Sequence, residues 1–409
     1  MNPKADNGGE HGLKRVLGLP LLILYGVGVT VGAGIFVLIG SVVGVAGPRA
    51  PLAFLFAAAI AGVTAASYAI LSRGFPAAAG ASLYVKAALG RGAGFPVGIG
   101  VALVGIVSSA TIMLGFTGYL AELLAVPQPL AIVGGLVLTG LLVQRGVSES
   151  VGAAAALTVV EIGILLVVIA AGAPVLATGE VWWVAFGTGS ALPVTAIVSA
   201  AVLAFFAFIG FEDIVNMAEE TVDPARVMGR AIIGTLAIST ALYLLLALIA
   251  AGAPDPAALA ASGAPLATMW QQLTGQSSAW LSTLALIAVV NGVIVQTIMA
   301  SRLLYGMARE EMMPAPLARV GRRRTPYVAI WLIVVLIAIL ALTLPIETLA
   351  RATTTVTLLV FAAVNLALLV LGSREKEGPL RRRRWIGALG LVLTAGLAIR
   401  EIFSLLGVI

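Results

Sequence analysis

The sequence predicts an all-helical membrane protein that crosses the bilayer many times. Of its 409 residues, 60% are hydrophobic and only 10% are charged, and the mean hydropathy is +1.10. A soluble globular domain carries about 25% charged residues. Apolar runs of about 20 residues, long enough to cross a hydrocarbon layer of about 30 Å as a helix, recur along nearly the whole chain. These observations exclude a soluble protein.

Eleven apolar segments are expected to span the membrane. They cover residues 17–43, 52–71, 94–124, 129–143, 151–173, 193–218, 229–252, 279–308, 327–344, 349–371 and 385–409. The first segment has no clear cleavage site, so we expect a retained helix rather than a signal peptide. The predicted organisation is a tail (1–13), a core (14–372), a basic loop (373–384) and an eleventh helix (385–409).

The basic residues predict the orientation of these helices. With a cytoplasmic N-terminus, 21 of the 24 Lys and Arg residues fall in cytoplasmic segments, and only Arg49, Arg351 and Arg400 lie outside. Cytoplasmic loops of membrane proteins carry an excess of Lys and Arg. We therefore expect a multi-pass protein of the cytoplasmic membrane, embedded in the lipid bilayer, with an extracytoplasmic C-terminus because the number of spans is odd.

The composition also excludes several chemistries. The chain has no cysteine, and its one histidine, His11, lies in the polar tail, so thiolate and histidine-based metal sites are excluded. The net charge of +6 follows from the topology and gives no support for nucleic-acid binding. A phosphate-binding glycine loop, metal-ligand spacing and a nucleophile motif are absent from the sequence. We expect no metal, no organic cofactor, no obligate protein partner and no enzymatic activity.

Small residues interrupt two of the spans at matching places. Residues 31–36 read VGAGIF, and residues 205–213 read FFAFIGFED. Gly34 and Gly210 are 176 residues apart, and the same offset brings the start of the second span next to the start of the seventh. Interrupted helices in matching positions of two halves indicate a transporter binding site, whereas close helix packing is the alternative for an isolated glycine stretch. We predict two five-helix repeats, over about 14–175 and about 190–372.

An interrupted helix exposes backbone groups that need partners inside a membrane. At the first break, the N–H groups of Ala33, Gly34 and Ile35 would open a second half-helix, whose positive dipole end can hold a carboxylate. Carbonyl groups that end the first half-helices could hold an ammonium group. These carbonyls belong to residues around Thr30, Val31, Phe206 and Ile209. A carboxylate site beside an ammonium site predicts a zwitterionic amino acid as substrate.

Three motifs resemble those of the amino acid-polyamine-organocation (APC) superfamily. They are the glycine motif at 31–36, the segment from Phe205 through Arg230-Ala231-Ile232, and the sequence SRLLYGMAR at 301–309 with the loop that follows it. The resemblance covers residues 14 to about 372. It implies a LeuT-type fold of five-plus-five inverted repeats with broken first and sixth helices, in which the eleventh span has no counterpart.

The resemblance also implies roles for individual residues. Phe206 would be an aromatic gate over the substrate, and the Ile209 carbonyl would receive its amine. Gln296 would line the pocket for the substrate side chain, although an interhelical hydrogen bond is the alternative. Ser108 and Ser109 are weaker candidates, because serine in a membrane helix commonly bonds its own backbone. The residues expected to contact the substrate through main-chain atoms are Thr30, Ala33 and Gly34.

Glu161 is the acidic residue that we expect deepest in the membrane. It lies ten residues into the fifth span, so it is about 15 Å deep. A carboxylate at that depth is costly unless it is protonated or paired, which favours a functional role over a structural hydrogen bond. Several proton-dependent members of the superfamily have a lysine at this place, so the sign of the charge is reversed here. Burial favours the neutral acid, so we expect Glu161 to bind H⁺, with ligation of Na⁺ as the alternative.

The sequence thus predicts a secondary active transporter that takes up amino acids by alternating access, coupled to protons. We expect small or apolar neutral substrates, because no acidic residue is expected in the pocket between the third, sixth and eighth spans. The alternatives are exchange of amino acids or organic amines, Na⁺-coupled transport, and a sensor that binds an amino acid without moving it. A membrane enzyme would need several converging polar groups at one depth, where only Glu161 is expected.

Overall fold

The computed structural model describes residues 15–75, 80–146, 151–187, 193–309 and 311–407. These residues are nearly all helical, and the β-pairing found among them is a single bridge between Leu17 and Thr221. Proline stands in the first turn of many of the helices, where its fixed φ favours helix initiation. The predicted helical membrane protein is confirmed.

The helices follow the predicted spans. The first half contains α1 (Leu19–Ala46), α2 (Ala50–Gly74), α3 (Gly80–Leu89), α4 (Arg91–Ala121), α5 (Gln128–Gln144) and α6 (Val151–Ala171). Between the halves lie α7 (Ala173–Ala177) and α8 (Glu180–Phe186). The second half contains α9 (Val194–Phe206), η2 (Phe211–Glu220), α10 (Pro224–Ala251), α11 (Pro256–Ala261), α12 (Pro265–Thr274), α13 (Ala279–Arg309), α14 (Tyr327–Thr343) and α15 (Ile346–Arg374), and α16 (Pro379–Leu405) follows.

Within the described residues, seven helical segments are long and apolar enough to cross a membrane. Shorter apolar helices lie at Leu19–Gly32, Gln128–Gln144, Ala155–Ala171 and Tyr327–Thr343. Each of the eleven predicted spans overlaps these segments, although the first span is divided between Leu19–Gly32 and Gly34–Gly74, and the latter also contains the second span. The predicted loop at 373–384 differs from the structure, because α16 already begins at Pro379 and contains Arg381–Arg384. Arginine is a good helix former, so the basic run continues the helix that the proline starts.

Both predicted helix breaks are present. In α1, the backbone leaves the helical region at Gly32, where φ is −17° and ψ is −138°. The sixth span stops as an α-helix at Phe206 and resumes at Phe211 as η2, a 3₁₀-helix of ten residues. Gly210 between them has φ +126°, a conformation that glycine adopts without strain. The breaks therefore form where the sequence supplies small, permissive residues.

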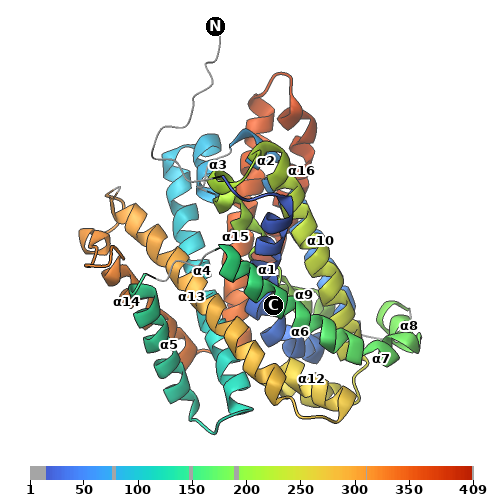
Figure 1. Ribbon diagram of the computed structural model, residues 1–409. Coiled ribbons are helices and arrows are strands. Elements are labelled where there is room, and N and C mark those ends of the chain that lie inside the picture. Colours follow the sequence, from blue (N-terminus) through green and yellow to red (C-terminus); the bar gives the residue numbers. More distant parts are fainter. Residues whose placement is uncertain (1–14, 76–79, 147–150, 188–192, 310, 408–409) are drawn as a thin grey trace.

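Helices of the first half pack against helices that hold the corresponding positions in the second of the two predicted repeats. α1 contacts α9, α2 contacts α10, α4 contacts α13, and α5 contacts α14. Figure 1 shows α1 and α9 at the centre, with α5, α13 and α14 on one side and α10 and α16 on the other. Such pairing is expected of two repeats related by a two-fold axis. It brings the two breaks together in the middle of the bundle.

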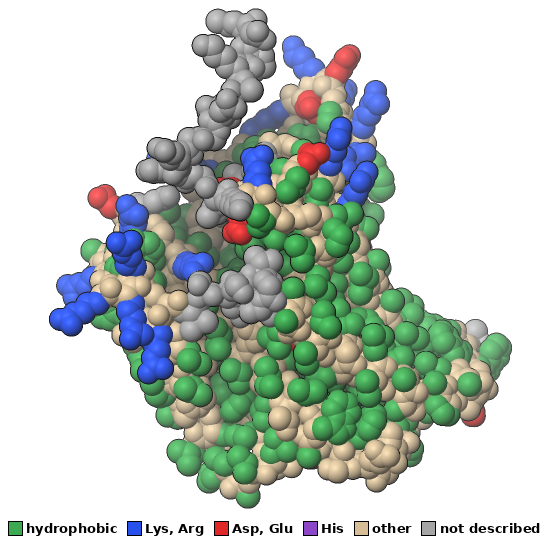
Figure 2. Space-filling model, in the orientation of Figure 1, with side chains coloured by type: hydrophobic (Ala, Val, Ile, Leu, Met, Phe, Trp, Pro, Cys, Tyr) green, Lys and Arg blue, Asp and Glu red, His purple; other side chains and the backbone are tan. Residues whose placement is uncertain are grey.

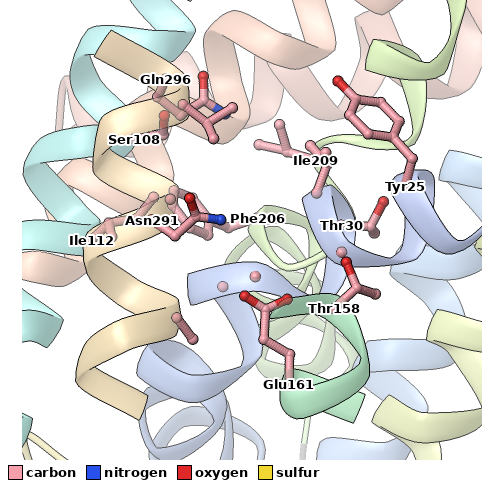
Figure 3. Close-up of a pocket in the computed structure, with 17 residues that line it drawn as sticks. Tyr25, Thr30, Ser108, Ile112, Thr158, Glu161, Phe206, Ile209, Asn291 and Gln296 are labelled. Carbon is pink, nitrogen blue, oxygen red and sulfur yellow. The ribbon is translucent and has the colours of Figure 1, made fainter. Parts of the chain in front are cut away.

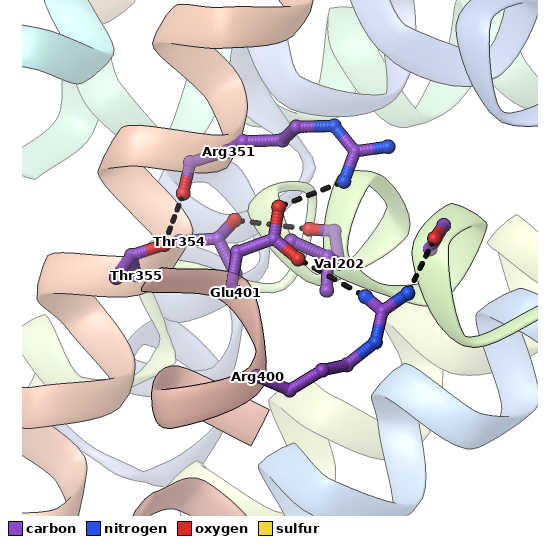
Figure 4. A network of polar contacts seen from close by, with 7 residues as sticks. Val202, Arg351, Thr354, Thr355, Arg400 and Glu401 are labelled. Carbon is purple, nitrogen blue, oxygen red and sulfur yellow. Dashed lines mark hydrogen bonds and ion pairs between the residues drawn. The ribbon is translucent and has the colours of Figure 1, made fainter. Parts of the chain in front are cut away.

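A buried ionic network attaches α16 to this bundle. Glu401 is fully buried and lies 2.7 Å from Arg351 of α15 and 3.1 Å from Arg400 of its own helix. Arg400 also donates a hydrogen bond of 2.7 Å to Ser199 of α9, and Thr354 donates one of 3.0 Å to the Val202 carbonyl (Figure 4). Although α16 has no counterpart in the repeats, it is fixed to the first half of the broken sixth span.

Charged side chains are concentrated at one end of the molecule. Figure 2 shows Lys and Arg gathered where α15 meets α16 and along the edge near the end of α13, whereas the opposite end shows few charges on this face. This end carries the residues that the sequence assigns to the cytoplasm. The distribution agrees with the direction predicted by the excess of basic residues.

Candidate functional site at the helix breaks

The two breaks lie in direct contact. A Cβ added at Gly34 would be 2.8 Å from the Cα of Ala207, and a Cβ added at Gly210 would be 2.9 Å from the Val29 carbonyl oxygen. Such distances leave no room for a larger residue. Glycine at these two positions therefore allows the unwound backbones of α1 and the sixth span to meet.

One tyrosine hydroxyl joins the two unwound backbones. The Tyr243 hydroxyl of α10 lies 2.8 Å from the Thr30 carbonyl oxygen and 2.9 Å from the Ala207 carbonyl oxygen. Tyr243 is fully buried, and its ring packs edge-on against Phe208 at 5.0 Å between centroids. The hydroxyl has one hydrogen, so the two carbonyls share a single donor. The sequence analysis missed this residue, although a tyrosine in a buried helix needs a hydrogen-bond partner.

A cavity of about 110 Å³ lies beside the breaks (Figure 3). Helices α1, α4, α6 and α13 and the broken sixth span line it. The predicted site residues that line it are Thr30, Gly34, Glu161, Phe206, Ile209 and Gln296. The structure thus brings together residues that are up to 266 positions apart in the sequence, between Thr30 and Gln296.

Three other predicted residues are placed differently. The Val31 and Ile35 side chains are fully buried in the hydrophobic core rather than along the cavity. The Ala33 side chain is outside the described part of the structure. Because the predicted contacts of these residues use main-chain atoms at the break, their roles stay predictions.

Further polar residues line the cavity that the sequence analysis did not assign to the site. Asn291 of α13 and Tyr25 of α1 are the clearest, and Figure 3 shows the Asn291 amide directed into the cavity beside Phe206. An amide within an apolar helix five residues before Gln296 was a signal available in the sequence. The two weaker serine candidates both donate a hydrogen bond to the Gly105 carbonyl of their own helix, at 3.2 Å for Ser108 and 2.7 Å for Ser109, and only Ser108 is among the residues that line the cavity.

Glu161 lines the same cavity as the predicted substrate-binding residues. It is 2% exposed, and its carboxylate is directed inward (Figure 3). It enters the lining from the fifth span, whereas the described lining residues of the third, sixth and eighth spans include no acidic one. Glu161 comes this near because α6 packs closely on α1, where Thr158 occupies the space that a Cβ at Gly28 would need.

A second cavity of about 710 Å³ adjoins the first. The two cavities share Tyr25, Ile209, Val295 and Gln296. The larger cavity extends past Glu212 and Asp213 of η2 to Arg302 near the end of α13, toward the end of the molecule rich in basic residues. At the opposite end, the backbone of α11 at Leu259 lies against Gly40 of α1, and Ser41 donates a hydrogen bond of 3.0 Å to Glu347 of α15. The larger cavity therefore extends from the site toward the end that the sequence assigns to the cytoplasm, and these contacts lie at the opposite end.

Comparisons with known proteins agree on one family. A family model described as amino acid permease matches residues 17–407. The chain is 29% identical to the branched-chain amino acid permease BcaP of Bacillus subtilis, over 97% of this chain and 88% of the relative. It is 27% identical to BcaP of Lactococcus lactis, over 86% of this chain and 80% of the relative. It is 31% identical to the chloroplastic cationic amino acid transporter 9 of Arabidopsis thaliana, over 75% of this chain but only 58% of that relative.

Proposed function

The chain belongs to the amino acid permease family, and we propose that it is a secondary active transporter that takes up small or apolar neutral amino acids together with a proton. The observation that carries this proposal is the cavity between two broken helices that touch each other. Helix breaks inside a membrane are stable only where backbone groups gain partners. A bound amino acid would supply a carboxylate for one set of these groups and an ammonium for the other.

The shape and lining of the cavity support a small neutral substrate. A cavity of about 150 Å³ holds benzene, so a volume of about 110 Å³ suits a small side chain. The lining residues on the side of α4 and α13 are uncharged, with Ser108, Asn291 and Gln296 as the polar groups there. A larger apolar side chain could extend past Ile209 into the second cavity. The branched-chain permeases among the relatives favour valine, leucine and isoleucine as the first compounds to test.

Two further residues have proposed roles in the transport cycle. Phe206 lines the cavity and is nearly buried, so its ring would cover the substrate in an occluded state. Glu161 would bind the coupling proton, because it is the one carboxylate among the described residues that line the cavity. We further propose a LeuT-type arrangement in the cytoplasmic membrane with the N-terminus inside, which agrees with the charged end seen in Figure 2.

Uptake into proteoliposomes tests the proposal. Radiolabelled L-valine and L-leucine would be offered with and without an inward pH gradient, to the wild type and to Glu161→Gln. We expect uptake by the wild type to rise with the gradient, and uptake by Glu161→Gln to lose this dependence. Exposed Glu122, which directly follows α4, gives the control variant Glu122→Gln, which should behave as the wild type. Uptake that needs a preloaded amino acid would indicate exchange, uptake that needs Na⁺ would assign the alternative cation, and binding without uptake would indicate a sensor.

A further inference from the structure

Glu161 and the start of the second half of α1 face the same small cavity. Gly32, Gly34 and Glu161 all line it. α1 and α6 pack together at Gly28 and Thr158, and both helices run toward the end where α11 and α12 lie (Figure 1). One helical turn beyond this contact, α1 reaches Gly32 and α6 reaches Glu161. The carboxylate is therefore at the level of the break.

The second half of α1 presents a site for a carboxylate at this level. It runs from the break at Gly32 to Ala46, and the first N–H groups of a helix have no carbonyl partner within it. The positive end of the helix dipole favours a negative group, and hydrogen bonds to a carboxylate are among the stronger ones. The proposed substrate would place its carboxylate here. The Glu161 carboxylate lines the same cavity, so it is placed to compete with the substrate carboxylate for these N–H groups.

A second observation also points to a ligand at this place. Thr30 lines the cavity and is only 2% exposed, yet its hydroxyl has no hydrogen-bond partner among the residues that the structure describes. A buried hydroxyl without a partner is costly. It lies two residues before the break, where a ligand bound to the second half of α1 would supply the missing hydrogen bond.

We propose that ionised Glu161 caps the second half of α1 in the substrate-free protein and must take up a proton before the substrate carboxylate can bind there. This inference rests on the proposed function and adds how the two ligands are coupled. The neutral acid accepts weaker hydrogen bonds from the N–H groups than the carboxylate does. Binding of the proton therefore favours binding of the amino acid. The proton stays on Glu161 while the substrate occupies the break, and both leave together.

Among the titratable groups in and around the cavity, Glu161 is the one whose charge we expect to change in the tested pH range. From α1, Tyr25 lines the same cavity, and from α10, Tyr243 interacts electrostatically with Glu161. Tyrosine keeps its proton between about pH 5 and about pH 8. The described lining residues of α4, α13 and the sixth span have no titratable side chain, and the sequences of α7 and α12 contain none.

Binding measured against pH tests the competition. The affinity of purified protein for L-valine and L-leucine would be measured from about pH 5 to about pH 8. We expect the dissociation constant of the wild type to rise with pH, by up to about tenfold per pH unit once Glu161 is ionised. Glu161→Gln mimics the neutral acid, so it should bind at all pH values as tightly as the wild type at low pH, while Glu122→Gln keeps the wild-type profile. A pH profile of Glu161→Gln identical to that of the wild type would overturn the proposal.

Two further measurements separate this inference from the proposed function. Isobutylamine, the decarboxylated analogue of valine, has no carboxylate to place at the N–H groups. The pH dependence of its binding should therefore be the same in Glu161→Gln and in the wild type. Without any ligand, the midpoint of thermal unfolding should be higher for the wild type than for Glu161→Gln at high pH, and this difference should shrink as the pH falls. If the tested amino acids do not bind, but the difference in unfolding midpoint shrinks as the pH falls, the substrate assignment is wrong and the capping of α1 by Glu161 is supported. If the difference is constant with pH, the cap is refuted whatever the substrate is.

Discussion

Replacing Tyr243 by phenylalanine isolates the hydrogen bonds that join the two helix breaks. The substitution removes the hydroxyl that lies 2.8 Å from the Thr30 carbonyl oxygen and 2.9 Å from that of Ala207. It keeps the ring, whose contacts with Phe54 and Phe208 have centroid distances of 6.0 Å and 5.0 Å. Because Tyr243 is fully buried, solvent water cannot readily replace the hydroxyl.

The expected loss of stability follows from the number of donors and acceptors. One hydrogen serves two carbonyls, so Tyr243→Phe removes one donor and leaves both carbonyl oxygens without it. A hydrogen bond contributes about 0.5–1.5 kcal/mol net, and a buried group left without a partner costs about 1–3 kcal/mol. Side-chain hydrogen bonds between membrane helices average about 0.6 kcal/mol. The carbonyls here lie at or beside the breaks and are buried, so we expect the upper range, a loss of about 1–3 kcal/mol in the free energy of unfolding.

The assay compares this variant with a matched one elsewhere. Tyr119 is also fully buried, and its hydroxyl donates a hydrogen bond of 2.7 Å to the Phe36 carbonyl, away from the cavity. Thermal unfolding in detergent should show a lower midpoint for both Tyr243→Phe and Tyr119→Phe. Only Tyr243→Phe should also weaken binding of L-valine, because only this variant frees the two breaks to separate. Wild-type stability of Tyr243→Phe, or an equal loss of affinity in both variants, would refute the reasoning.

Three other substitutions test the site and its support. Gly34→Ala places a Cβ 2.8 Å from the Cα of Ala207 and should abolish uptake. The control Gly134→Ala has open space around it and should leave uptake unchanged. Normal uptake by Gly34→Ala would contradict the close approach of the two backbones. Phe206→Ala should lower the affinity for L-leucine and speed its release in a filter-binding assay, and unchanged release would argue against the proposed gate. Glu401→Gln leaves the positive charges of two arginines without their carboxylate and should cost about 3–5 kcal/mol in the free energy of unfolding, which a wild-type melting temperature would disprove.

The features predicted well were those that depend on local sequence. Apolar runs marked the spans because crossing the bilayer sets their length, and small residues marked the breaks because only they adopt such backbone geometry. Contacts between distant segments could not be predicted in this way. The shared hydroxyl of Tyr243 joins residues 213 and 36 positions away. The entry of Glu161 into the pocket depends on how closely α6 approaches Gly28, and one sequence contains no measure of that distance.

The short helices α11 and α12, between the seventh and eighth spans, were also not predicted. In the structure, the backbone at Gly263, between them, approaches Gly118 of α4 so closely that a side chain at Gly118 would collide with it. The packing at this end of the molecule therefore depends on glycines whose partners become visible only in three dimensions.

The 3₁₀ geometry of η2 changes both the length and the pattern of the inner half of the sixth span. A 3₁₀-helix rises about 2.0 Å per residue instead of 1.5 Å, so ten residues extend over about 20 Å rather than about 15 Å. Side chains three positions apart also eclipse one another. Asp213 and Asn216 therefore stand in one row along the larger cavity, linked by a contact of 3.4 Å. The lengthened segment thus places these two polar side chains in line beside the larger cavity, whereas in an α-helix they would be offset by about 60° around the axis.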